Sequence, residues 1–219
     1  MCQPMAFGEL IESLPSLPRE WEHIRYGVLD PRVERDVAGR ISGRVNAVLG
    51  VTSCSLLRAI SEATCGRGDV YLIHPSDEIL NVLMDAVRSN GLTNVDVRRA
   101  PLHRLPAENR AFDTVFFLLQ LHHEGDPIIA LREAKRVLRT DGRVVILEAA
   151  GRPGSAHSIS ALDVPAAKNQ IETWLSRAGL RVNATSVTTN GFRIRKGSEE
   201  SSYDPITVEA VVDAGPPTE

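Results

Sequence analysis

The chain has 219 residues, with 25 lysines and arginines against 28 aspartates and glutamates, and a net charge of −3. This length predicts one domain with an added segment and a substantial core. The slightly negative charge supplies no broad positive field for a nucleic-acid backbone, so no nucleic-acid partner is expected. The apolar runs fall far short of the roughly 20 residues that a membrane helix needs, so no membrane span is expected. The three cysteines, an odd count without a C-x-x-C pair, argue against a disulfide framework and a cysteine-based zinc finger.

The chain divides into three parts by pattern. Residues 1–44 predict an N-terminal helical segment, a possible lid, with helices over Met5–Leu14 and Arg32–Ile41. Residues 45–213 predict the main domain, and residues 214–219, rich in proline and glycine, predict a loose tail. The N-terminus lacks a basic region before an apolar core, so a secretory signal is not expected. We therefore expect a cytoplasmic location.

Short apolar runs alternate with helical patterns through the middle of the chain. This alternation predicts a parallel sheet with helices on both faces, a three-layer α/β fold whose ligand crevice lies beyond the carboxyl ends of the strands. The predicted strands are 46–51, 70–73, 95–98, 114–118 and 143–148, and the predicted helices are 56–63, 77–89 and 127–138.

The pattern changes after residue 150. A helix is expected over Val164–Ala178, followed by two β-rich segments, Arg181–Thr188 and Ile206–Asp213, with no helix between them. Two such segments predict an antiparallel pair at one edge of the sheet. The charged stretch between them, with Arg193, Arg195, Lys196, Glu199 and Glu200, predicts a solvated loop.

A series of short motifs follows in order between residues 94 and 143. The motifs are Asn94-Val95-Asp96-Val97, Leu105-Pro106, Phe112-Asp113-Thr114-Val115, Leu121-His122-His123, Asp126-Pro127, Leu131-Arg132-Glu133-Ala134 and Arg136 to Arg143. In their order and spacing they resemble class I S-adenosylmethionine (SAM)-dependent methyltransferases, and the nearest group is the small-molecule one that includes quinone-ring C-methyltransferases. The resemblance implies a Rossmann-like methyltransferase fold, mainly parallel with an antiparallel C-terminal hairpin, SAM as cofactor and a small-molecule methyl acceptor.

The chain departs from the family at three cofactor contacts. In the turn after the first strand, Gly50-Val51-Thr52-Ser53-Cys54, only Gly50 keeps the family's glycine. His74 replaces the carboxylate that binds the ribose hydroxyls, and Pro101 replaces the aspartate that accepts from the adenine amino group. The resemblance places ten positions at the cofactor: Gly50, Thr52, Cys54, His74, Pro75, Pro101, Leu102, Leu118, Leu119 and Gln120.

Soft side chains follow several of the predicted strands. Cys54, His74, His103 and His122 could form a divalent metal site at the carboxyl edge, since imidazole and thiolate suit zinc, copper or iron; packing or helix capping is the alternative. For methyl transfer, His122 or His123 could act as the base. Gln120 and Glu124 are interpreted as solvated residues, with contact to the substrate as the alternative.

Three functions remain open from the sequence. The first is methyl transfer from SAM to a small molecule. The second is a catalytically silent, methyltransferase-like protein that acts through a protein partner. The third is an enzyme with a repurposed pocket and chemistry other than methyl transfer. The partner is therefore a small molecule or a protein, and a homodimer is possible.

Overall fold

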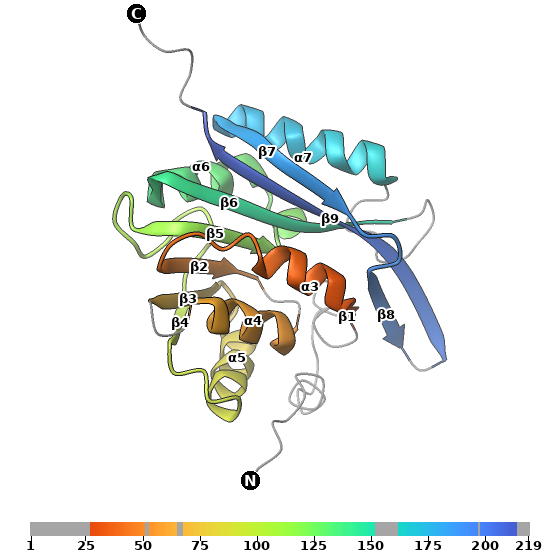
Figure 1. The fold of residues 1–219 in the computed structure, drawn as a ribbon, viewed down its shortest axis with the longest axis horizontal. Helices are drawn as coiled ribbons and strands as arrows, with labels where there is room; N and C mark the ends of the chain where they lie inside the picture. The colour runs from red at the N-terminus through yellow and green to blue at the C-terminus, as the bar shows by residue number, and fades with distance from the viewer. Residues whose placement is uncertain (1–26, 51–52, 65–67, 152–161, 197, 214–219) are drawn as a thin grey trace, which may run out of the picture.

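The computed structural model describes residues 27–50, 53–64, 68–151, 162–196 and 198–213 (Figure 1). The helix predicted over Met5–Leu14 and the tail predicted over residues 214–219 lie outside these ranges. Within them, no helix is long and apolar enough to cross a bilayer.

A curled sheet with the strand order β1-β8-β9-β6-β5-β2-β3-β4 forms the centre of the molecule, and β7 also pairs with β9. The strands from β2 to β6 are parallel, as predicted, so their carboxyl ends meet at one edge of the sheet. The strands are β1 (Gly27–Leu29), β2 (Val45–Leu49), β3 (Asp69–His74), β4 (Val95–Arg99), β5 (Phe112–Leu118), β6 (Leu138–Ala150), β7 (Leu180–Val187), β8 (Phe192–Lys196) and β9 (Glu199–Val212).

Helices cover both faces of the sheet and give the predicted three layers (Figure 1). On one face lie α3 (Pro31–Ala38), α4 (Cys54–Thr64) and α5 (Asp77–Ser89). On the other lie α6 (Pro127–Val137) and α7 (Val164–Ala178). Side chains alternate between the two cores: Phe116 packs toward the first group of helices, and Val115 and Phe117 pack toward the second.

Local signals fix where the helices begin. Ser76 caps α5 and Asp126 caps α6, where Pro127 occupies the first turn. Asp163 caps α7, and Gly179, with φ +75°, ends it. The bounds of α5 and α7 agree with the predicted ranges residue for residue because these caps are visible in the sequence.

The long strand β9 organises the C-terminal part of the sheet. It pairs antiparallel with β6, β7 and β8, which confirms the predicted antiparallel pair. The solvated loop predicted around Arg193 and Arg195 is wrong: these residues lie on β8, whose Phe192 and Ile194 are buried. Their alternation with exposed arginines is the signature of a half-buried strand.

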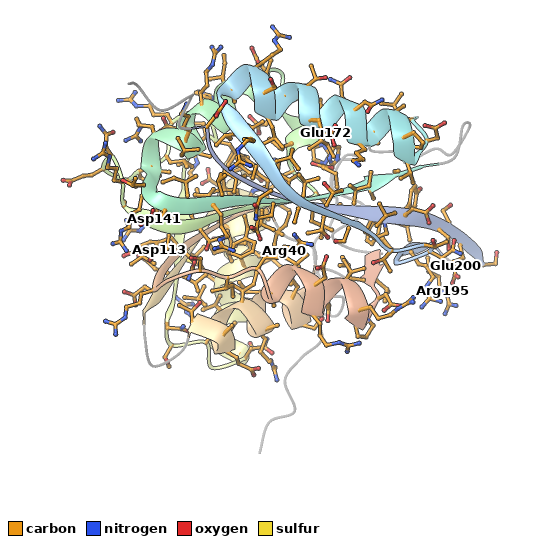
Figure 2. All side chains as sticks on the ribbon, turned by 45° about the horizontal axis from the view of Figure 1, so that its top comes forward. Arg40, Asp113, Asp141, Glu172, Arg195 and Glu200 are labelled. Carbon is orange, nitrogen blue, oxygen red and sulfur yellow. The ribbon has the colours of Figure 1, made fainter. Side chains whose placement is uncertain are left out.

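The amino edge of the sheet is held by Asp113 at the start of β5. Its Oδ2 accepts hydrogen bonds from the backbone N–H groups of Arg44 and Val45, each at 2.8 Å. Figure 2 shows Asp113 at the end of the molecule opposite to Arg195 and Glu200, which form an ion pair at 2.8 Å on the β8–β9 hairpin. Strand β9 pairs with β6 as far as Ala150, opposite Asp204, and with β8 from Tyr203 toward its own start. The β8–β9 hairpin therefore extends past the carboxyl edge of the parallel strands.

Candidate functional site

Polar and special backbone positions converge on the carboxyl edge of the sheet. Gly50 follows β2, His74 ends β3, and Leu119 and Gln120 follow β5. Glu148 lies near the end of β6. Because parallel strands bring their carboxyl ends together, residues far apart in the chain meet here.

The turn at Gly50 is built against the segment that follows β5. Gly50 has φ +82°, and a Cβ placed on it would lie 2.6 Å from the carbonyl oxygen of Leu118 and 2.8 Å from Cβ of Gln120. Leu119 also has a positive φ, +51°, and its N–H donates to the carbonyl of Leu147 at 2.8 Å. The glycine that the chain retains is therefore required by the packing of the two turns.

His74 is fully buried at the end of β3. Its Nδ1 lies 3.1 Å from the N–H of Ser76, which donates to it. Burial lowers the pKa of His74 to about 4, so the imidazole is neutral at pH 7. A neutral, backbone-bonded ring therefore stands at the position where the sequence resemblance leads us to expect a ribose-binding residue.

His122 and Glu148 form a close pair. Nδ1 of His122 lies 2.9 Å from Oε2 of Glu148, and Oε1 of Glu148 accepts from the N–H of Leu121 at 2.9 Å. Only 5% of the Glu148 side chain and 12% of the His122 side chain are exposed. Since a carboxylate only accepts hydrogen bonds, Nδ1 of His122 donates in this pair.

His123 lies directly beside the ring of His122. The two rings are 3.7 Å apart, centroid to centroid. Burial, together with smaller effects of the nearby His122 and His74, lowers the pKa of His123 to about 3. An imidazole that resists protonation so strongly is a poor proton acceptor at neutral pH.

Gln120 is buried, not solvated, which corrects one of the sequence interpretations; its exposed fraction is 1%. Its side chain hydrogen-bonds Glu124. Burial raises the pKa of Glu124, while the hydrogen bond from Gln120 and the nearby His103 oppose the rise.

Helix α3 contacts the beginning of α4 beside the Gly50 turn. The carboxylate of Glu34 accepts hydrogen bonds from the hydroxyls of Ser53, at 2.8 Å, and of Ser55. Ser53 Oγ in turn accepts from the N–H of Leu56 in the first turn of α4 at 3.1 Å. A carboxylate at a helix N-terminus is favourably placed, so this contact ties α3 to the wall of the site.

The other positions implied by the resemblance vary in exposure. Leu102, Leu118 and Leu119 are buried, whereas Pro101 is exposed and Pro75 is intermediate. Thr52 lies outside the described residues, and of Cys54 only its place at the start of α4 is described.

The metal hypothesis gains no support from the part of the chain that the structure describes. Within it, no three histidine, cysteine, aspartate or glutamate side chains come close enough to hold an ion. His103 is exposed on the loop after β4, whereas His74 is buried at the end of β3.

Sequence reasoning did not identify Glu148 as a site residue. It lies 26 positions from His122, and only the pairing of β5 with β6 brings the two together. A single carboxylate within the apolar run Val144-Val145-Ile146-Leu147-Glu148-Ala149-Ala150 was the available signal.

The buried His74 makes stability depend on pH. The unfolded chain takes up a proton near pH 6.5, but the folded chain resists it until about pH 4, so the unfolded state binds more protons in this window. Stability is therefore expected to fall from pH 7 to pH 4, with His74 contributing on the order of 3 kcal/mol of the loss. Urea unfolding at several pH values measures it. In His74→Gln this part of the slope should disappear; an unchanged slope contradicts the assignment.

The sequence and fold both match known methyltransferases. A family described as "Methyltransferase domain" matches residues 48–146. A ubiquinone/menaquinone biosynthesis C-methyltransferase from Vibrio campbellii is 32% identical over 114 residues, which cover 52% of this chain and 44% of that protein. The chain spans 35 to 44% of the length of the first curated relatives that it matches.

Solved structures agree over nearly the whole chain. A SAM-dependent methyltransferase from Aquifex aeolicus has a TM-score of 0.67 at 20% identity, covering 94% of this chain and 98% of that one. The [4+2]-cyclase SpnF has a TM-score of 0.64 at 16% identity, covering 84% and 81%. At these identities the likeness establishes the fold, and the predicted Rossmann-like methyltransferase fold is confirmed.

Proposed function

We propose that the chain, in which residues 48–146 match the methyltransferase domain family, is a class I SAM-dependent methyltransferase that transfers a methyl group to a small molecule at the carboxyl edge of its sheet. The observation that carries this proposal is the His122–Glu148 pair, in which a buried carboxylate holds the imidazole in one orientation at the carboxyl edge of the sheet. Quinone-ring carbon methylation, the activity named for the Vibrio campbellii relative, is one candidate reaction.

The residues at the edge divide the chemistry between them. Glu148 accepts a hydrogen bond from Nδ1 of His122 and fixes the orientation of the ring. In this proposal Nε2 of His122 removes the proton from the acceptor atom. Glu148 also holds the N–H of Leu121, so the same carboxylate positions the backbone that carries His122. A proton on the attacking oxygen, nitrogen or carbon is removed as the methyl group is accepted.

In this proposal SAM binds at the carboxyl edge of the sheet, next to the turn that begins at Gly50. The place that a Cβ on Gly50 would take is filled by the carbonyl oxygen of Leu118 and the side chain of Gln120, so the glycine lets the two segments that would line the site pack together. At the end of β3, His74 offers an imidazole in place of the family's carboxylate, so the ribose end has a weaker set of acceptors. When bound, SAM supplies the electrophilic methyl group.

The test is direct binding followed by product analysis. Titration of the purified chain with SAM and with S-adenosylhomocysteine should raise its thermal stability, because a ligand at 100 times its dissociation constant adds about 2.7 kcal/mol. Incubation with SAM and a panel of quinols, phenols and amines should then give a product heavier by one methyl group.

Two alternatives correspond to different results of this test. A stability increase with SAM but no methylated product from any acceptor favours a silent protein that works through a partner. No stability change up to millimolar SAM overturns the proposal and favours a repurposed pocket, a possibility supported by the shared fold of the [4+2]-cyclase SpnF.

A further inference from the structure

We propose that β7 is the surface on which this chain binds a second copy of itself, through antiparallel pairing of the two β7 strands in a two-fold dimer. The inference goes beyond the proposed methyl transfer and does not depend on it. Strand β7 pairs with β9 on one side, and no strand of the described ranges pairs with its other side. Figure 2 shows β7 on the outside of the molecule, between α7 and α3. An open strand edge of this kind is a template for another strand.

The other two edge strands of the sheet are protected against such pairing. On the five-residue strand β4, both arginines and the aspartate are charged, and Arg98 forms an ion pair with Asp96 at 2.7 Å. Strand β1 is only three residues long. Strand β7 has eight residues, with no proline or lysine and with Arg181 as its one charged residue. Short length and charge are common protections of a sheet edge, and β7 has little of either.

A β-bulge makes β7 complementary to itself. The bulge lies between Val182 and Ala184, where Asn183 is the extra residue. Before the bulge the even-numbered residues of β7 face α6 and α7, and after it the odd-numbered ones do, because their partners on β9 belong to that core. Asn183 and Ala184 both lie on the face that carries α3, where the Asn183 amide donates to Oε1 of Glu209 at 2.6 Å. The order of faces along β7 therefore reads the same in both directions.

This symmetry lets two β7 strands pair over their whole length. Opposite residues of an antiparallel pair point to the same face, so a regular strand of eight residues could not set its first residue against its last. With the bulge, every pair matches when a two-fold axis passes between positions 183 and 184. The pairs are Leu180 with Val187, Arg181 with Ser186, Val182 with Thr185 and Asn183 with Ala184. Such a self-complementary interface is typical of two-fold dimers.

The residues that this register brings together are chemically complementary. Val187, which is 44% exposed, comes to lie beside Leu180 of the second copy, at the border of the core. Arg181 is exposed and forms no ion pair with another described residue. Opposite it stands Ser186 of the second copy, whose hydroxyl donates to Oδ2 of Asp36 at 2.5 Å. The Asp36 side chain is 32% exposed, so the guanidinium of one copy reaches the carboxylate of the other, and the two-fold axis repeats this ion pair.

The two sites of such a dimer stay separate. Strand β7 runs parallel to β6, because both are antiparallel to β9, so its end lies at the carboxyl edge of the sheet. Since the two β7 strands run in opposite directions, the carboxyl edges of the two copies point away from each other. Loss of the dimer should therefore leave the affinity for S-adenosylhomocysteine unchanged. This affinity keeps a failure of the inference distinct from a failure of the proposed function.

Sedimentation equilibrium of the full chain measures the dissociation constant of the dimer, and the wild type should dimerise within about 1 to 100 μM. Val187→Lys places a charge on the edge, and Arg181→Glu turns both ion pairs into repulsions. Each variant should raise the dissociation constant about 10-fold or more. The matched control is Val28→Lys, which changes another exposed valine, on β1, and should leave the dissociation constant as it is in the wild type.

Hydrogen exchange on the wild type locates the interface without any substitution. Exchange of the amides of β7 should slow as the protein concentration rises, whereas exchange in β4 should not change. The inference is overturned by a wild type that stays monomeric, by protection of β4 instead of β7, or by a dimer that Arg181→Glu leaves intact. An equal effect of Val28→Lys and Val187→Lys overturns it too. If Val187→Lys does not fold, the exposed Arg181 and the exchange measurement decide the question.

Discussion

Replacing Gly50 with alanine is expected to destabilise the protein by about 2 to 5 kcal/mol, combining left-handed backbone strain with overpacking. The glycine has φ +82°, and the added methyl group would meet the backbone oxygen of Leu118 at 2.6 Å. Backbone cannot rotate away as a flexible side chain can. Urea unfolding of Gly50→Ala against the wild type measures the loss.

Gly91 supplies the matched control. Its φ is +63°, but a Cβ placed on it would meet nothing within 4 Å. Gly91→Ala should therefore cost only the strain, about 1 to 2 kcal/mol. Equal losses in the two variants would show that crowding against the segment after β5 contributes nothing.

Substitution of His122 by glutamine is expected to lower kcat by about 10²- to 10⁴-fold, the range for losing a positioned proton acceptor. Because the proposed role of the ring is to accept a proton and not to hold the cofactor, the dissociation constant for S-adenosylhomocysteine should stay close to that of the wild type. Single-turnover rates and calorimetry separate the two effects. A parallel loss of binding would assign His122 to the pocket wall.

Glu148→Gln tests the same pair from its other side. Its amide oxygen can still accept from the N–H of Leu121, but its NH2 group would face Nδ1 of His122. Nδ1 would then have to accept, the proton would move to Nε2, and the base would be lost. A comparable fall in kcat with an intact fold is expected. His103→Gln, which changes an exposed histidine on the loop after β4, should leave kcat unchanged.

The sequence predicted the elements whose boundaries carry their own signals. Ser76 and Asp163 begin α5 and α7, and the apolar run after Asp113 marks β5, so these ranges needed no tertiary information. The predicted strand through Val51 extends too far, because β2 ends at Leu49 and Gly50 turns the chain. Strand β8 was missed because its exposed arginines resemble a loop until Phe192 and Ile194 are seen to face the core.

The candidate site was predictable only in part, for a physical reason. Positions such as Gly50 and His74 follow strands and could be placed at the carboxyl edge by topology alone. The role of Glu148 could not be predicted in this way, because it depends on its contact with His122, which lies just after the neighbouring strand β5. Burial of Gln120 likewise depends on the close approach of the Gly50 turn, which no periodicity in the sequence encodes.

The position of β9 affects how the chain matures on the ribosome. In the sheet β9 pairs with β6, β7 and β8. It is nevertheless the last of these strands to be synthesised. While translation continues, β6 presents an open hydrogen-bonding edge, and the inner residues Ile206, Val208 and Ala210 have not yet arrived to close the core. Nascent chains at this stage carry the exposed strand edge and apolar surface that chaperones bind. Folding is thus completed after synthesis of the sheet, not during it.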